Sequence, residues 1–100
     1  MIGRLYDHSF PYLDSLIGGW FHQDLDIYGD TLDEVIAAYR QGAPVEDWMG
    51  VRADIHRFLR LHKEDQLTEQ FGKTFHHEVD PELWEMTTRQ WLLKVDELLQ

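Results

Sequence analysis

Cysteine is absent from this chain of 100 residues. Its absence excludes disulfide bonds, thiolate nucleophiles and every zinc site that uses cysteine ligands. No stretch approaches the roughly 20 apolar residues that a membrane-spanning helix needs, and residues 1–5 lack the apolar run of a signal peptide. Together these absences predict a protein that stays in a reducing cytoplasm.

Basic side chains are scarce, with nine lysines and arginines against nineteen aspartates and glutamates, for a net charge of −10. This balance repels phosphate backbones and anionic lipid, so we expect neither a nucleic-acid partner nor a membrane partner. Residues 1–34 and 64–100 each carry −6, whereas residues 35–63 carry +2. Two acidic flanks around a mildly basic centre favour a basic partner.

Apolar residues make up 43% of the chain, which is enough for a single domain over residues 1–100 with one hydrophobic core. Helical periodicity recurs along the chain, and no convincing pair of strands is present. The sequence predicts an all-α domain of about five helical segments packed as an irregular bundle. The expected helices span residues 11–19, 31–41, 45–63, 65–71 and 88–99, with a single turn near 81–86.

Capping signals indicate where the first two helices begin and end. Ser9 is expected to cap the first helix, and Gly18-Gly19 to end it. Thr31, with Glu34 three residues later, predicts a capping box for the second helix. Both helices are therefore bounded by signals that act within three or four residues.

The second half of the chain has similar signals. Asp65 is expected to cap a brief helix that Gly72 ends, and residues 74–79 are expected to be extended because they have no helical period. Thr88 is expected to cap the last helix, which has the strongest amphipathic pattern in the chain.

Four tryptophans and a basic ridge are candidate binding features. Trp48 and Trp91 fall on apolar stripes and are expected in the core, whereas Trp20 and Trp84 are candidates for exposed anchors. The ridge lies on one side of the third helix, where it is expected to pair with the protein's own acids or to face water. Its members are Arg52, His56, Arg57, Arg60 and Lys63.

Residues 22–30 form the densest polar cluster of the chain. If Asp24 is the first position of an EF-hand loop, Tyr28 and Val35 fall where calcium requires side-chain oxygens, so we expect no calcium site. His22 beside Asp24 leaves open a metal- or carboxylate-dependent hydrolase. No phosphate-binding glycine loop or nucleophile elbow accompanies them, and we expect no enzyme, no cofactor and no metal.

Residues 16–26 read Leu-Ile-Gly-Gly-Trp-Phe-His-Gln-Asp-Leu-Asp, and residues 88–92 read Thr-Arg-Gln-Trp-Leu. The first string resembles the opening signature of the contact-dependent growth inhibition immunity proteins, with Leu25 where members often carry Trp. The second resembles the final helix of that family. The resemblance implies a cytoplasmic protein that binds and neutralises the C-terminal toxin domain of a large exported effector, often a nuclease.

The acidic flanks suit this implied partner, because a toxin that binds nucleic acid needs a basic cleft, which carboxylates can occupy. The toxin-facing residues are expected to be acids of the two flanks. The first set is Asp24, Asp26, Asp30, Asp33 and Glu34, and the second is Glu78, Asp80, Glu82 and Glu85.

Two other interpretations stay open. The same acids are also suited to cap turns and helices, which would place the toxin surface elsewhere. A generic helical module that forms a homodimer or binds another protein through apolar contacts would need no toxin, and self-association is compatible with the composition.

Overall fold

The computed structural model describes residues 10–21, 31–75 and 81–100, apart from the side chain of Leu83. Within these ranges the chain forms five α-helices and one short 3-10 helix, and no strand. The predicted all-α fold is therefore confirmed. The elements are α2 (Pro11–Trp20), α3 (Leu32–Gly42), α4 (Val45–Leu61), α5 (Glu64–Phe75), η2 (Pro81–Trp84) and α6 (Thr88–Leu98).

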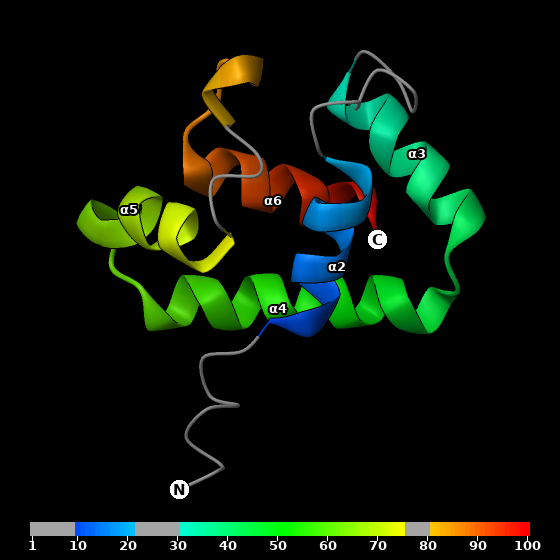
Figure 1. Cartoon of the computed structure of the whole chain (residues 1–100), viewed down its shortest axis with the longest axis horizontal. Coiled ribbons are helices and arrows are strands. Elements are labelled where there is room, and N and C mark those ends of the chain that lie inside the picture. Colours follow the sequence, from blue (N-terminus) through cyan, green and yellow to red (C-terminus); the bar gives the residue numbers. More distant parts are fainter. Residues whose placement is uncertain (1–9, 22–30, 76–80) are drawn as a thin grey trace, which may run out of the picture.

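Helix α4 forms one long side of the molecule (Figure 1). Helices α2 and α6 pack on it, while α3 and α5 lie toward its two opposite ends. The short η2 helix and the first turn of α3 lie on the side of the molecule away from α4 (Figure 1). Helix α6 runs between these two sides and is the element through which α3, α4, α5 and η2 are joined.

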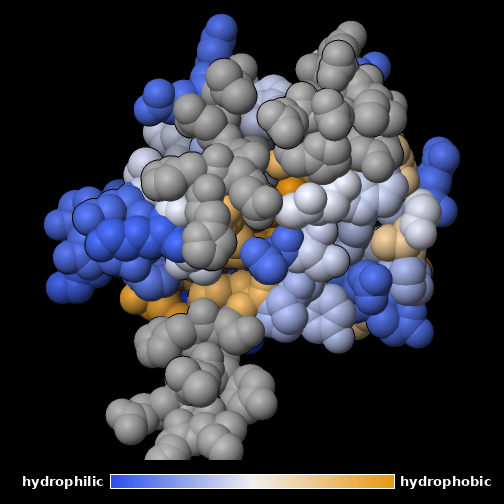
Figure 2. All heavy atoms as spheres, viewed as in Figure 1, coloured by the Kyte–Doolittle hydropathy of each residue, from blue (hydrophilic) through white to orange (hydrophobic). Residues whose placement is uncertain are grey.

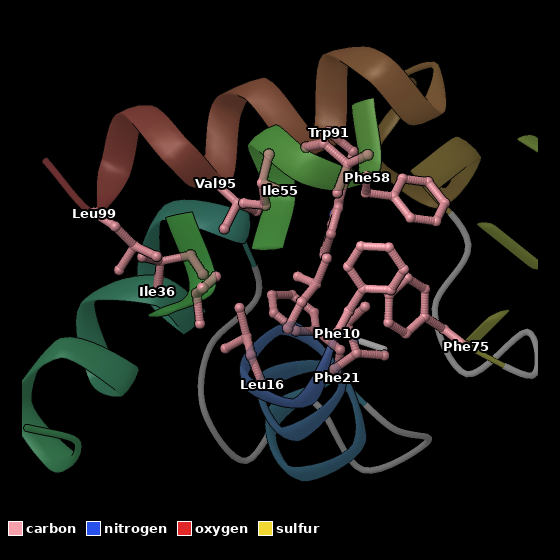
Figure 3. Packing of buried hydrophobic residues seen from close by; sticks show 14 of the residues in the cluster. Phe10, Leu16, Phe21, Ile36, Ile55, Phe58, Phe75, Trp91, Val95 and Leu99 are labelled. Atoms are coloured by element: carbon pink, nitrogen blue, oxygen red, sulfur yellow. The ribbon is translucent and has the colours of Figure 1, made fainter. Parts of the chain in front are cut away.

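The core is rich in aromatic side chains that come from distant parts of the chain (Figure 3). The rings of Phe10 and Phe58 meet edge to face at 5.2 Å, and so do those of Phe21 and Trp91. Phe71 and Trp91 lie 5.7 Å apart. Burying each large apolar side chain contributes about 1.5–3 kcal/mol, so these ring contacts help to hold α2, α4, α5 and α6 together.

The amino end of α2 is capped from another helix. Its N-cap position is Phe10, whose side chain makes no capping hydrogen bond. Ser9, the expected cap, lies outside the described residues. Asp54 of α4 instead accepts the backbone N–H groups of Tyr12 at 2.9 Å and Leu13 at 3.1 Å. This carboxylate lies about 40 residues away along the chain, so no local pattern could reveal the cap.

Glycine does not end α2 or α5 where expected. Helix α2 passes through Gly19 to Trp20, and α5 passes through Gly72 to Phe75. A glycine inside a helix costs about 1 kcal/mol, but the buried Phe75 ring packs against Phe58 and Phe71, and burial of such a ring outweighs that cost. Phe75 is therefore helical rather than extended, while residues 76–79 lie outside the described residues.

Threonine caps begin α3 and α6. The predicted box at Thr31 is confirmed. In α6 the cap is Thr87 rather than Thr88: the Thr87 hydroxyl accepts the Gln90 N–H at 3.1 Å, and the Gln90 side chain accepts the Thr87 N–H at 2.9 Å. Thr88 is instead the first helical residue, and its buried hydroxyl donates to Thr68 of α5 at 3.0 Å.

The tryptophans pack on the core. Trp91 is fully buried, and Trp48 is half-buried with its indole N–H donated to the Ala43 carbonyl at 2.9 Å. Trp20 and Trp84 are also half-buried and pack edge to face on the rings of Tyr39 and Phe21. Neither is the exposed anchor that the sequence allowed.

Gly50 allows the close crossing of α2 and α4. A Cβ placed at this position would lie 2.6 Å from Cδ1 of Tyr12 and closer still to other atoms at the base of that ring. Because these atoms are near the backbone, they cannot swing away as the tip of a side chain would. The structure thus explains a glycine that otherwise weakens the interior of α4.

Gly50→Ala is expected to lower the free energy of unfolding by about 1–2 kcal/mol, because the steric cost exceeds the gain of about 1 kcal/mol in helix propensity. Urea denaturation measures this change. Gly19→Ala in α2 is the matched control, since nothing lies within 4 Å of a Cβ there, and it should stabilise slightly. Equal stabilisation by both substitutions would contradict the proposed crossing.

Candidate functional site

The first predicted acidic set is partly described by the structure. Asp33 and Glu34 are exposed on the first turn of α3. The Glu34 carboxylate accepts the Thr31 N–H at 3.2 Å, so it caps the helix as well as facing solvent. Both charges also lie at the amino end of a helix, where the macrodipole favours them. The other three members, Asp24, Asp26 and Asp30, lie outside the described residues.

Two members of the second acidic set lie within the described residues: Glu82 is exposed on η2, and Glu85 is exposed directly after it. Glu78 and Asp80 lie outside the described residues. The turn after η2 has the hydrogen bonds of a Schellman motif: the Met86 N–H is donated to the Pro81 carbonyl at 3.2 Å, and the Glu85 N–H to the Glu82 carbonyl at 2.9 Å. Glu85 occupies the left-handed position of this motif with φ of 58°. Glycine is the residue favoured there.

The four described members of the predicted site form two pairs, not one cluster. The Asp33–Glu34 pair belongs to α3 and the Glu82–Glu85 pair to the η2 turn. Both elements lie on the side of the molecule away from α4 (Figure 1). We call these four residues the α3 pair and the η2 pair.

The basic ridge of α4 is largely engaged by the protein's own acids. Arg52 Nε lies 2.9 Å from one carboxylate oxygen of Asp96 on α6, and His56 Nε2 lies 3.1 Å from the other. Arg57 lies 3.4 Å from the capping Asp54. The structure thus confirms the expected internal pairing for these three members of the ridge.

Asp96 is a buried carboxylate whose charge is stabilised. Burial by itself raises its pKa, but the hydrogen bonds and positive charges of Arg52 and His56 outweigh burial and hold the pKa below its usual value of 3.8. Only 11% of the Asp96 side chain is exposed, and its contact with Arg52 joins α6 to α4. Its role is therefore to hold these two helices together.

The free energy of unfolding should depend on this carboxylate in acid. Because the folded pKa is lower than the unfolded one, the stabilisation by Asp96 is complete above about pH 4 and is lost as the pH falls through the folded pKa. Asp96→Asn should cost about 1–2 kcal/mol at pH 6, since its partners are partly exposed. Urea denaturation between pH 6 and 3 should show the difference from the unsubstituted protein shrinking, and a constant difference would contradict this linkage.

A third group of exposed acids, outside the two predicted sets, occurs on α5. Glu64, Asp65 and Glu69 are exposed there, and Figure 2 shows hydrophilic side chains gathered over this end of the molecule. Glu69 lies 3.3 Å from Lys73, and Glu64 lies 3.9 Å from Arg89. These neighbouring bases offset part of the charge of the α5 group.

The hydrolase interpretation depends on His22 and Asp24, which lie outside the described residues. In the part of the chain that the structure describes, no three histidine, aspartate or glutamate side chains are grouped so as to hold a metal ion. None of the helices described is long and apolar enough to span a bilayer.

Comparisons with known proteins identify the family. No curated protein matches this sequence, and no solved structure matches it. A family model described as CdiI immunity protein matches residues 9–99, a range that begins just before the capped end of α2 and reaches the last turn of the chain. This is the family that residues 16–26 and 88–92 resemble. The chain therefore belongs to the CdiI immunity protein family.

Proposed function

We propose that this chain protects its own cell by binding the C-terminal toxin domain of a large exported effector, and that the α3 and η2 pairs contact a basic cleft of that domain. Membership of the CdiI immunity protein family supports the immunity role. The observation that supports the acidic contact is the placement of both pairs, exposed and away from α4. The protein acts in the cytoplasm as a binder and not as an enzyme.

The proposed partner is a nuclease, because a nuclease cleft must attract phosphate and therefore also attracts carboxylates. Complementary charge raises association rates to about 10⁸–10⁹ M⁻¹s⁻¹ at low salt, from about 10⁵–10⁶ without steering. A chain with net charge −10 would thus associate rapidly with such a cleft. Rapid association is what protection of a growing cell requires.

Growth rescue tests the proposal directly. Cells that express the toxin domain encoded beside this chain should stop growing, and co-expression of this chain should restore growth. The chain carrying Val51→Asp, which places a charge in the buried core, serves as the unfolded control. Equal death with and without the folded chain would refute the immunity role.

A helical module that binds through apolar contacts is the second candidate. Val45 and Met49 are 53% and 63% exposed, one turn apart on α4, and Tyr12 of α2 is 45% exposed. Such a surface would bind with little dependence on ionic strength. Binding of the toxin that is equally tight at 50 mM and 500 mM salt would favour this candidate over the acidic contact.

Glu85 should show opposite effects on stability and on binding. Glu85→Gly is expected to raise the free energy of unfolding by about 1 kcal/mol, because glycine adopts positive φ without strain, and to weaken toxin binding through the lost carboxylate. Glu85→Gln, which keeps the strain and removes the charge, should weaken binding equally at unchanged stability. Thermal unfolding and calorimetric titration measure the two effects, and full binding by both variants would remove Glu85 from the contact.

A further inference from the structure

A cavity of about 210 Å³ lies beside the η2 pair, between α5, η2 and the first turn of α6. Pro81 and Thr88 are buried and form its deeper part, whereas Glu82 is exposed at its rim. Met86, which lines the cavity and also packs against the core, is held in the hydrogen-bonded turn that follows η2. Its lining residues are Thr68, Pro81, Glu82, Met86, Thr87 and Thr88.

The lining combines apolar walls with oxygen atoms that accept hydrogen bonds. The Pro81 ring and the Met86 side chain supply the apolar walls. Glu82 is the charged residue of the lining, and the hydroxyls of Thr68 and Thr88, which lie 3.0 Å apart, belong to two of its polar residues. A lysine or arginine side chain has the matching shape, since its methylene stem packs on apolar surface while its charged end needs acceptors.

We propose that this cavity binds one lysine or arginine side chain of the toxin. This inference rests on the proposed function and names the group that the η2 region recognises. The stem would lie against Pro81 and Met86, and the cationic end would meet the Glu82 carboxylate. Glu85, three residues further on, adds a second negative charge to the same turn.

The charge at the rim decides between a cation and an anion. The amino end of α6 carries roughly half a positive charge, which would attract an anion. The negatively charged Glu82 in the lining and the net charge of −10 repel one. Two of the groups at the amino end of α6, the Thr87 and Gln90 N–H groups, are also already bonded within the capping box. A cation is therefore the favoured occupant.

Three small probes of equal length isolate the role of charge. Butylammonium, butanol and butanoate are titrated in turn into the protein labelled at its methionine and threonine methyl groups. Butylammonium should shift the Met86, Thr68 and Thr88 methyl signals, with saturation in the millimolar range. Glu82→Gln should weaken this binding about tenfold, whereas Glu69→Gln on α5, outside the cavity, should not change it. An equal response to butanol, or a stronger response to butanoate, would overturn the proposal.

The toxin domain gives the second test. Thr68→Trp, at an exposed position of α5, should fill the cavity and weaken toxin binding about tenfold, mainly through faster dissociation. Gln66→Trp places the same bulk on α5 outside the cavity and should bind as tightly as the unsubstituted chain, with circular dichroism confirming that both variants fold. If Thr68→Trp binds fully while growth rescue persists, the cavity proposal fails and the immunity proposal stands. If neither the unsubstituted chain nor any variant rescues growth, the immunity proposal fails, whatever the butylammonium titration shows.

Discussion

Asp54→Ala is expected to lower the free energy of unfolding by about 3 kcal/mol, one of the largest effects of any single substitution in this chain. The carboxylate is 5% exposed, accepts two backbone N–H groups of α2 and lies 3.4 Å from Arg57. Its removal leaves those N–H groups without this acceptor and removes the ion pair with Arg57. Urea denaturation measures the loss.

Two further variants separate the contributions of Asp54. Asp54→Asn keeps an oxygen that accepts the N–H groups and removes only the charge, so about half of the loss is expected. Asp14→Ala removes an exposed acid from the first turn of α2 itself, where the helix dipole makes it worth about 0.5 kcal/mol. If Asp54→Ala costs no more than Asp14→Ala, the long-range cap does not hold α2 on α4.

Neutralising the α3 and η2 pairs together is expected to slow toxin association about 10- to 100-fold at low salt and to flatten its dependence on ionic strength. The variant carries Asp33→Asn, Glu34→Gln, Glu82→Gln and Glu85→Gln. Glutamine at position 34 can still accept the Thr31 N–H of the capping box, so the fold should be retained. Stopped-flow measurements between 25 mM and 500 mM salt give the rate constants.

A matched control separates local contact from net charge. Glu46 and Asp47 begin α4, and Glu64 and Asp65 begin α5. Their conversion to glutamine and asparagine removes the same number of charges from residues that belong to neither pair and do not line the cavity beside η2. This control should slow association less than about threefold through net charge alone. Equal slowing by both variants would mean that overall charge, and not the two pairs, steers the encounter.

Interactions between near neighbours in the chain made much of the fold predictable. Apolar residues spaced three and four apart identified the helices, and Thr31 with Glu34 identified a capping box that the structure contains. The predicted cap of α6 was wrong by one residue, because two threonines stand side by side at positions 87 and 88. The predicted end of α5 was three or four residues too early, because the packing of Phe75 outweighs the effect of Gly72.

The candidate site was only partly predictable. The acids could be counted and assigned to two flanks, yet nothing in their spacing showed that Glu85 would occupy a left-handed turn or that Glu82 would border a cavity. The cavity needs Thr68 of α5 to meet the first turn of α6, twenty residues later. A contact of that range leaves no periodic signal.

The sequence by itself determined the all-α class, the positions of the helices, the excess of acid and the family, because these depend on composition, on short strings and on contacts within one helical turn. Only the tertiary structure decided that Asp54 caps α2, that Asp96 holds Arg52 and His56, and that the acids form two pairs away from α4. Each of these features joins residues that are more than 40 positions apart or on different helices. Their geometry follows from how the helices pack, which no pattern within one segment encodes.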